Sequence, residues 1–243
     1  MEWWEALLLV FGGAAAGVIN SMAGGGSMLT VPLLVLAGVP GNDANGTNRV
    51  GIFTSNAAAV AGFRQKGISG LAHGWPALAP SAAGALVGAV AIGRLTDETF
   101  ETVFGLLMIP LIVLTIWKPD VAEGGPHWSV PTTMFVFFFV GIYAGAVQAG
   151  VGLVMIAALS RAGFDLVTAN SIKVLVNMSM TVVALAVFMA SGSVRWGPAI
   201  VLAVGLSFGG WLGARFSVAG GEKWIRIVMV VAAVALAARL LFG

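Results

Sequence analysis

The sequence predicts an all-α integral membrane protein of about ten transmembrane segments, arranged as two inverted repeats of five segments. The composition is 59% hydrophobic and 9% charged, with a mean hydropathy of +0.99, whereas soluble domains carry about 25% charged residues. The two halves of the chain also resemble each other. In each half the second segment is short or broken, as is common at transporter binding sites.

Ten apolar segments are candidates, since a spanning helix needs about 20 apolar residues. They occupy residues 5–22, 27–39, 44–63, 74–94, 99–117, 131–148, 152–162, 167–190, 196–216 and 222–242. A polar stretch at 119–130 divides the chain into a first repeat at 1–118 and a second at 131–243. The N-terminus lacks the positive region and cleavage site of a signal peptide, so the first run is expected to stay in the lipid bilayer.

The repeat is visible in glycines and asparagines. Gly17 aligns with Gly145, and Asn20 stands opposite Gln148. After a gap of three residues the offset becomes 125, which pairs seven further positions: Gly38 with Gly163, Ala44 with Ala169, Asn45 with Asn170, Phe63 with Phe188, Gly67 with Gly192, Gly84 with Gly209, and Gly88 with Gly213. Internal repeats of this kind are frequent in secondary transporters.

The second and seventh segments are unusual because neither is long enough to span a bilayer as a regular helix. Residues 27–39 contain Pro32, and residues 152–162 number only eleven. Each segment follows a glycine cluster, Gly24-Gly25-Gly26 or Gly150-Val151-Gly152. The alternative is an ordinary short helix in a thin part of the protein.

Loop charges favour a topology in which all ten segments cross with the N-terminus outside, because Lys and Arg prefer the cytoplasmic side. Arg94, Arg195 and Arg239 then lie outside, and seven cations lie inside: Arg64, Lys66, Lys118, Arg161, Arg215, Lys223 and Arg226. If the two short segments do not cross, the split is five against five. With five crossings in each repeat, the halves would be inverted relative to each other.

Each repeat carries one cation among amides within an apolar helix. Asn45, Asn48, Arg49 and Asn56 share one helical face, as do Asn170, Lys173, Asn177 and Thr181. A charge at membrane depth is costly unless it is paired, so both cations mark a functional site. Arg, Lys and amide donors in duplicated positions indicate a site for an anion.

The candidate substrate-binding residues come from the cation stripes, the glycine breaks and their flanks. Exposed backbone amides and helix N-termini at the breaks would add to the attraction for an anion. The set is Asn20, Gly24, Gly25, Gly26, Ser27, Asn45, Asn48, Arg49, Gln148, Gly150, Gly152, Asn170, Lys173 and Asn177.

Two structural alternatives remain open for these residues. Arg49 and Lys173 lie only a few residues from the start of their segments, so their heads could snorkel to the interface. The asparagines could serve only as hydrogen bonds between helices. Every Asp and Glu lies near a segment end or in a loop, which argues against a cation site and against a buried carboxylate relay.

Other functions are disfavoured. The chain has no cysteine, which excludes thiol chemistry and disulfides. It shows no metal-ligand cluster, phosphate-binding loop or Ser-His-Asp set, and no basic surface for nucleic acid. We therefore expect neither an enzyme nor a bound cofactor.

The chain resembles the sulfite exporter TauE/SafE family, also called the toluene-sulfonate uptake permeases. The resemblance covers essentially the whole chain and rests on Gly17-Val-Ile-Asn20, Ala23-Gly-Gly-Gly-Ser27, Pro32-Leu-Leu, Ala44-Asn-Gly-Thr-Asn-Arg49, Gly145 to Gly152, and Gly213-Ala-Arg215. It implies a permease of the bacterial inner membrane for sulfite, sulfoacetate or related organosulfonates. It also implies no ATP-hydrolysing subunit, so coupling to a proton or another ion is expected. The second repeat departs from the first, with Asn170-Ser-Ile-Lys173 opposite Asn45-Gly-Thr-Asn48.

The expected function is an alternating-access transporter of a small sulfur-containing anion, acting as a monomer or homodimer. The alternatives are an anion channel, a permease for carboxylates or other anions, and a membrane enzyme or scaffold.

Overall fold

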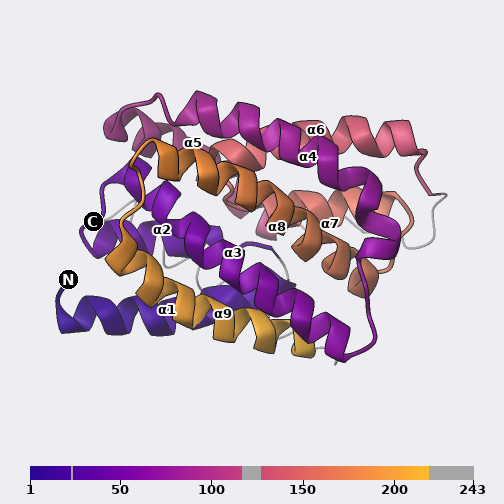
Figure 1. The fold of residues 1–243 in the computed structure, drawn as a ribbon, viewed down its shortest axis with the longest axis horizontal. Helices are drawn as coiled ribbons and strands as arrows, with labels where there is room; N and C mark the ends of the chain where they lie inside the picture. Colours follow the sequence, from indigo (N-terminus) through magenta and orange to yellow (C-terminus); the bar gives the residue numbers. More distant parts are fainter. Residues whose placement is uncertain (23, 117–126, 219–243) are drawn as a thin grey trace.

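A computed structural model describes residues 1–22, 24–116 and 127–218, and within these ranges the regular structure is helical (Figure 1). The helices are α1 (Trp3–Met22), α2 (Ser27–Leu36), α3 (Gly41–Gln65), α4 (Leu71–Ile92), α5 (Asp97–Ile116), α6 (Val130–Ala146), α7 (Val151–Arg161), α8 (Leu166–Ala190) and α9 (Trp196–Val218). The first nine predicted segments are thus confirmed as helices. The tenth, at 222–242, and most of the connecting loop at 119–130 lie outside the described residues.

Four of the described helices are long and apolar enough to cross a membrane: α1, α4, α8 and α9. The predicted short segments are short helices, with 10 residues in α2 and 11 in α7. At 1.5 Å per residue each covers about half of a 30 Å apolar core.

The helices form two groups: α1 and α3 pack on α9, and α6 and α8 pack on α4 (Figure 1). Glycine permits the closest approaches, as small residues do between membrane helices. A Cβ on Gly209 would overlap the Ala14 carbonyl, and a Cβ on Gly84 would overlap the Phe138 carbonyl. Each group therefore combines helices from both halves of the chain.

Successive contacts give the direction of each helix. Gly205, Gly209 and Gly213 of α9 meet Val10, Ala14 and Val18 of α1, so these two helices are parallel. Glycine contacts that advance in the same direction along both helices show that α3 is parallel to α9 and that α6 is parallel to α4. Short turns at 66–70 and 191–195 reverse the chain between α3 and α4 and between α8 and α9. Hence α1, α3 and α9 run one way, and α4, α6 and α8 run the other way (Figure 1).

The α2 helix leads the chain back along α1. Gly26 lies against Ala16 and Asn20, whereas Gly12 lies against Leu33, so the two helices are antiparallel neighbours. Because α3 begins at the end of the molecule where α1 begins, residues 23–40 return the chain to that end.

The halves match with a nearly constant offset. The ends of α1 and α6, at Met22 and Ala146, differ by 124 residues, and the starts of α3 and α8 differ by 125. Left-handed glycines recur at Gly38 and Gly163 and at Gly67 and Gly192, all with positive φ. The predicted pairing of Gly17 with Gly145 is wrong by one helical turn. Gly17 lies against the Leu206 carbonyl, and Gly141 lies against the Ser81 carbonyl.

The break after α1 is predicted to be intolerant of any side chain. Gly24 has a φ of +82° and a Cβ there would overlap the backbone of Gly152, whereas Gly38, with a φ of +77°, has open space around it. Gly38→Ala should cost only the left-handed strain of about 1–2 kcal/mol, and Gly24→Ala clearly more. Melting temperatures in detergent compare the two variants, and equal losses would contradict the proposed backbone contact.

Asp165 caps α8 by accepting hydrogen bonds from the backbone N–H groups of Val167 and Thr168, both at 3.0 Å. Partial burial alone would raise the pKa of this carboxyl, but the hydrogen bonds from Thr168 and Val167 outweigh it and lower the pKa. The stability that the lowered pKa contributes is therefore present above the unfolded value of 3.8 and is lost as the pH falls through the folded value.

Asp165→Ala should cost about 1 kcal/mol at neutral pH because it removes the helix cap. The difference from the parent protein should shrink in acid, and Asp165→Asn, which keeps an acceptor, should cost less. Melting curves at neutral and acidic pH test this. A cost that does not change with pH would count against the charged cap.

Candidate functional site

The two helix breaks meet inside the molecule. The Gly152 N–H, at the start of α7, donates to the Gly24 carbonyl at 3.2 Å, and neither residue has room for a Cβ because of the other. The starts of α2 and α7 therefore lie close to the ends of α1 and α6. In this structure the Gly152 amide is therefore paired with backbone.

Arg49 of α3 binds the end of α6. Its guanidinium donates to the carbonyls of Ala144 at 2.6 Å and Gly145 at 2.7 Å, with a longer bond of 3.4 Å to Ala146. Asn45, one turn earlier, donates to the Ala146 carbonyl at 2.8 Å and accepts from Arg49 at 3.4 Å. The guanidinium also lies 5.3 Å from the centre of the Phe188 ring.

Lys173 of α8 binds the end of α1 in a comparable way. Its Nζ donates to the carbonyls of Asn20 at 2.8 Å and Ser21 at 3.0 Å, and to Oδ1 of Asn170 at 2.8 Å. The side chains of Lys173 and Arg49 are 1% and 0% exposed. Snorkelling to the interface is therefore excluded for both cations.

Each cation thus satisfies carbonyls that end the first helix of the opposite half. The last carbonyls of a helix lack intrahelical partners and carry partial negative charge, so a buried positive donor is a suitable partner. The two cations share no hydrogen-bond partner, and each has an asparagine of its own helix beside it. The direct partners of both cations are backbone carbonyls.

The amides form a second layer. Asn20 donates to Oδ1 of Asn56 at 3.4 Å. Gln148, which has a left-handed φ of 63°, donates to Thr181 at 2.7 Å and to Asn177 at 3.3 Å. Asn56 and Thr181 are 125 residues apart, so Asn20 and Gln148 reach corresponding places, although Asn20 lies on a helix and Gln148 on a turn.

Some buried polar atoms have no partner in the described part of the chain. Four of them can donate and lie on one stretch of α3: Nδ2 of Asn48, Nε of Arg49, Oγ of Ser55 and Nδ2 of Asn56. Oε1 of Gln148, between α6 and α7, is an unpaired acceptor. Hydrogen bonding between helices therefore uses the Oδ1 atoms of Asn48 and Asn56. It leaves their Nδ2 donors without a partner.

The remaining predicted residues support the break between helices. Gly25, Gly26 and Ser27 are buried at the start of α2, and Gly150 precedes α7 as its N-cap with a φ of 66°. The Asn170 amide donates to Ser217 of α9 at 3.4 Å.

Four contributing residues were absent from the predicted set. Thr30 donates to Oδ1 of Asn48 at 2.6 Å, Thr181 accepts from Gln148, and Phe188 lies beside Arg49. Tyr143 donates to the Ala149 carbonyl and so fixes the turn after α6. The helical stripe included Thr181, and the repeat pairs Phe188 with Phe63, but no sequence signal indicates Thr30 or Tyr143.

The buried polar side chains of the described residues include cations, amides and hydroxyls but no Asp or Glu. Within the same residues no group of three His, Asp or Glu side chains could hold a metal ion.

Comparisons with known proteins agree with a membrane transporter. The chain is 31% identical over 231 residues to "Probable membrane transporter protein ORF9" of Sinorhizobium sp, covering 93% of this chain and 88% of that protein. It is 26% identical to "Probable membrane transporter protein YfcA" of Escherichia coli K12, over 97% of this chain and 89% of the relative. A "Probable membrane transporter protein" of Haemophilus influenzae is 25% identical, over 95% and 92%.

No solved structure matches the chain. The description of the family that matches is "Sulfite exporter TauE/SafE", and its model covers residues 9–240, which include both helix breaks and both buried cations. The chain belongs to the sulfite exporter TauE/SafE family of membrane transporters.

Proposed function

We propose that the protein is a secondary active transporter of small sulfur-containing anions such as sulfite or sulfoacetate. The substrate would be held at the junction of the two halves, and its movement would be coupled to a proton or another ion. The candidate ligands remain the residues predicted from the sequence, with the free donors of α3 in the leading role.

The observation that carries the proposal is the surplus of buried donors. An unpaired buried donor costs about 1–3 kcal/mol, yet α3 holds four of them within nine residues, on Asn48, Arg49, Ser55 and Asn56. An oxyanion has several acceptor oxygens and would satisfy them together. Hydrogen bonds to a charged partner are also stronger than neutral ones.

The charge balance supports an anion. A helix end carries about half an elementary charge, positive at the N-terminus and negative at the C-terminus. The ends of α1 and α6 and the starts of α2 and α7 therefore cancel. Arg49 and Lys173 then leave the interior with a net charge of about +2, without a buried acid among the described residues.

Two inverted five-segment repeats, at 1–118 and 131–243 with a connecting loop at 119–130, form the framework of the proposal. The matched helix bounds, the recurring left-handed glycines and the opposite directions of α1 and α6, α3 and α8, and α4 and α9 support this. Inverted repeats place the substrate between two broken helices and permit alternating access.

The proposed location is the bacterial inner membrane. The ends of α3, α7 and α9 bring Arg64, Lys66, Arg161 and Arg215 to one end of the molecule, which would be cytoplasmic. Asp97, Glu98 and Glu101 lie at the opposite end, with Arg94 and Arg195. The relatives named above come from bacteria.

An anion channel and a permease for carboxylates are the competing functions. Counterflow in proteoliposomes separates a carrier from a channel, because only a carrier accelerates uptake of labelled sulfite when unlabelled sulfite is trapped inside. Competition by sulfoacetate, acetate and sulfate then ranks the anion class.

Removing a free donor should slow transport. Asn48→Ala and Asn56→Ala are each expected to lower sulfite flux at low concentration about tenfold, the equivalent of one charge-assisted hydrogen bond. Thr54→Ala is the matched control, since Thr54 lies on the same helix and bonds only to the Gly51 carbonyl. Equal flux in all three variants would show that the unpaired donors of Asn48 and Asn56 do not bind the substrate.

Removing a cation should affect both transport and stability. Arg49→Gln and Lys173→Gln should nearly abolish sulfite flux and lower the melting temperature, because each leaves helix-end carbonyls unpaired at about 1–3 kcal/mol apiece. Arg49→Lys and Lys173→Arg keep the charge and should retain more of both properties. Normal flux in the two Gln variants would disprove the charge requirement.

A further inference from the structure

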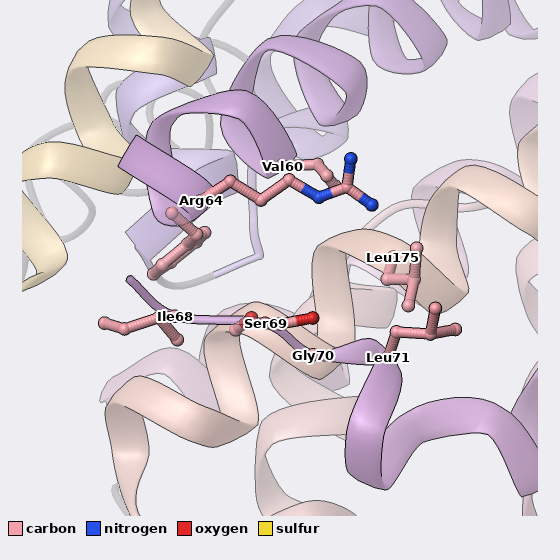
Figure 2. A pocket seen from close by; sticks show the side chains of 9 residues that line it. Val60, Arg64, Ile68, Ser69, Gly70, Leu71 and Leu175 are labelled. Atoms are coloured by element: carbon pink, nitrogen blue, oxygen red, sulfur yellow. The ribbon is translucent and has the colours of Figure 1, made fainter. Parts of the chain in front are cut away.

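A small cavity opens at the end of the molecule where α3 finishes. It lies between α3, the 66–70 turn and the start of α8, and its lining includes Val60, Arg64, Ser69, Ser171 and Leu175. Figure 2 shows Arg64 extended above the turn, with its guanidinium on the side of Leu175 and Ser69 below it. An exposed cation and two hydroxyls thus surround one hollow.

The cavity is aligned with the donors of α3. Asn56, Val60 and Arg64 are spaced by four residues, so they follow one another along one face of the helix. Asn56 lies at the inner end with an unpaired Nδ2, and Arg64 lies at the outer end. Ser171 lines the same cavity and is only 3% exposed, so this opening is the route by which a solute would approach its hydroxyl.

An ion pair stands at the corresponding place at the opposite end of the molecule. There Nε of Arg195 bonds to Asp43 at 2.7 Å, and the Arg195 N–H donates to Thr47 at 2.9 Å. The offset of 125 places Thr168 and Gly70 where this end has Asp43 and Arg195. The end with the cavity therefore lacks the residues for the same ion pair.

We propose that this cavity is an anion vestibule of the transport pathway, in which Arg64 draws an oxyanion from one side of the membrane toward Asn56. The inference rests on the proposed transport of an anion. A cation at the mouth of a low-dielectric cleft raises the local concentration of anions. The Asp43–Arg195 pair holds the other end shut in this conformation.

Cysteine labelling tests the vestibule without any substrate, because the chain has no cysteine of its own. Ser171→Cys is exposed to two thiol reagents of similar size, the anionic sulfonatoethyl and the cationic trimethylammonioethyl methanethiosulfonate. Vesicles of both orientations are used, and Lys66→Cys reports which side is which. The anionic reagent should react from the Lys66 side, and Arg64→Gln should slow it about fivefold relative to the cationic reagent.

Matched variants keep the test specific. Lys66→Gln removes a cation at the same end, outside the cavity lining, and should leave the ratio of the two rates unchanged. Val194→Cys, at the place corresponding to Ser69, should label slowly until Asp43→Asn breaks the ion pair. Ser69→Cys replaces Ser171→Cys if the latter does not fold.

Three results would overturn the vestibule: no labelling from the Lys66 side, a rate ratio that Arg64→Gln leaves unchanged, or the same change in Lys66→Gln. A separate assay of sulfite flux distinguishes this outcome from failure of the proposed function. Charge-selective labelling without flux would contradict the transport proposal alone.

Discussion

The fold depends on how two helices end inside an apolar molecule. The last carbonyls of α1 and α6 have no water to bond to, and each unpaired group would cost several kcal/mol in hydrocarbon. Lys173 supplies the donors for the end of α1, and Arg49 supplies them for the end of α6. Because each cation comes from the opposite half of the chain, the helix breaks also fix the halves to each other.

This arrangement explains why the breaks lie where donors accumulate. Ending α1 and α6 inside the molecule creates room for α2 and α7 to start there, and the glycines let the two breaks touch at Gly24 and Gly152. Helix ends of opposite sign cancel, whereas the two cations have no buried acid beside them among the described residues. The charge that stabilises the breaks is therefore also the charge that an anion would meet.

The sequence predicts much of the framework, because apolar runs, glycine clusters and duplicated asparagines are local signals. It predicts nine helices that the structure describes, and it identifies Arg49 and Lys173 as buried cations. It does not predict their carbonyl partners. Those carbonyls belong to the opposite half of the chain, and residue spacing within one helix carries no information about such distant contacts. The alignment of Gly17 with Gly145 is misplaced by one turn for a related reason: the glycine pattern repeats along each helix, and only packing against Leu206 and Ser81 decides between registers.

The two halves share a framework but differ in their free hydrogen-bonding groups. On α8 the Thr181 hydroxyl donates to the Asn177 carbonyl and accepts from Gln148, so this stretch uses its polar groups internally. On α3 the corresponding stretch retains unpaired donors on Asn48 and Asn56. The helix ends of both halves are satisfied in the same way, by a cation of the opposite half. The difference between Asn56 and Thr181 therefore leaves the free donors on α3, on the same helical face as Arg64.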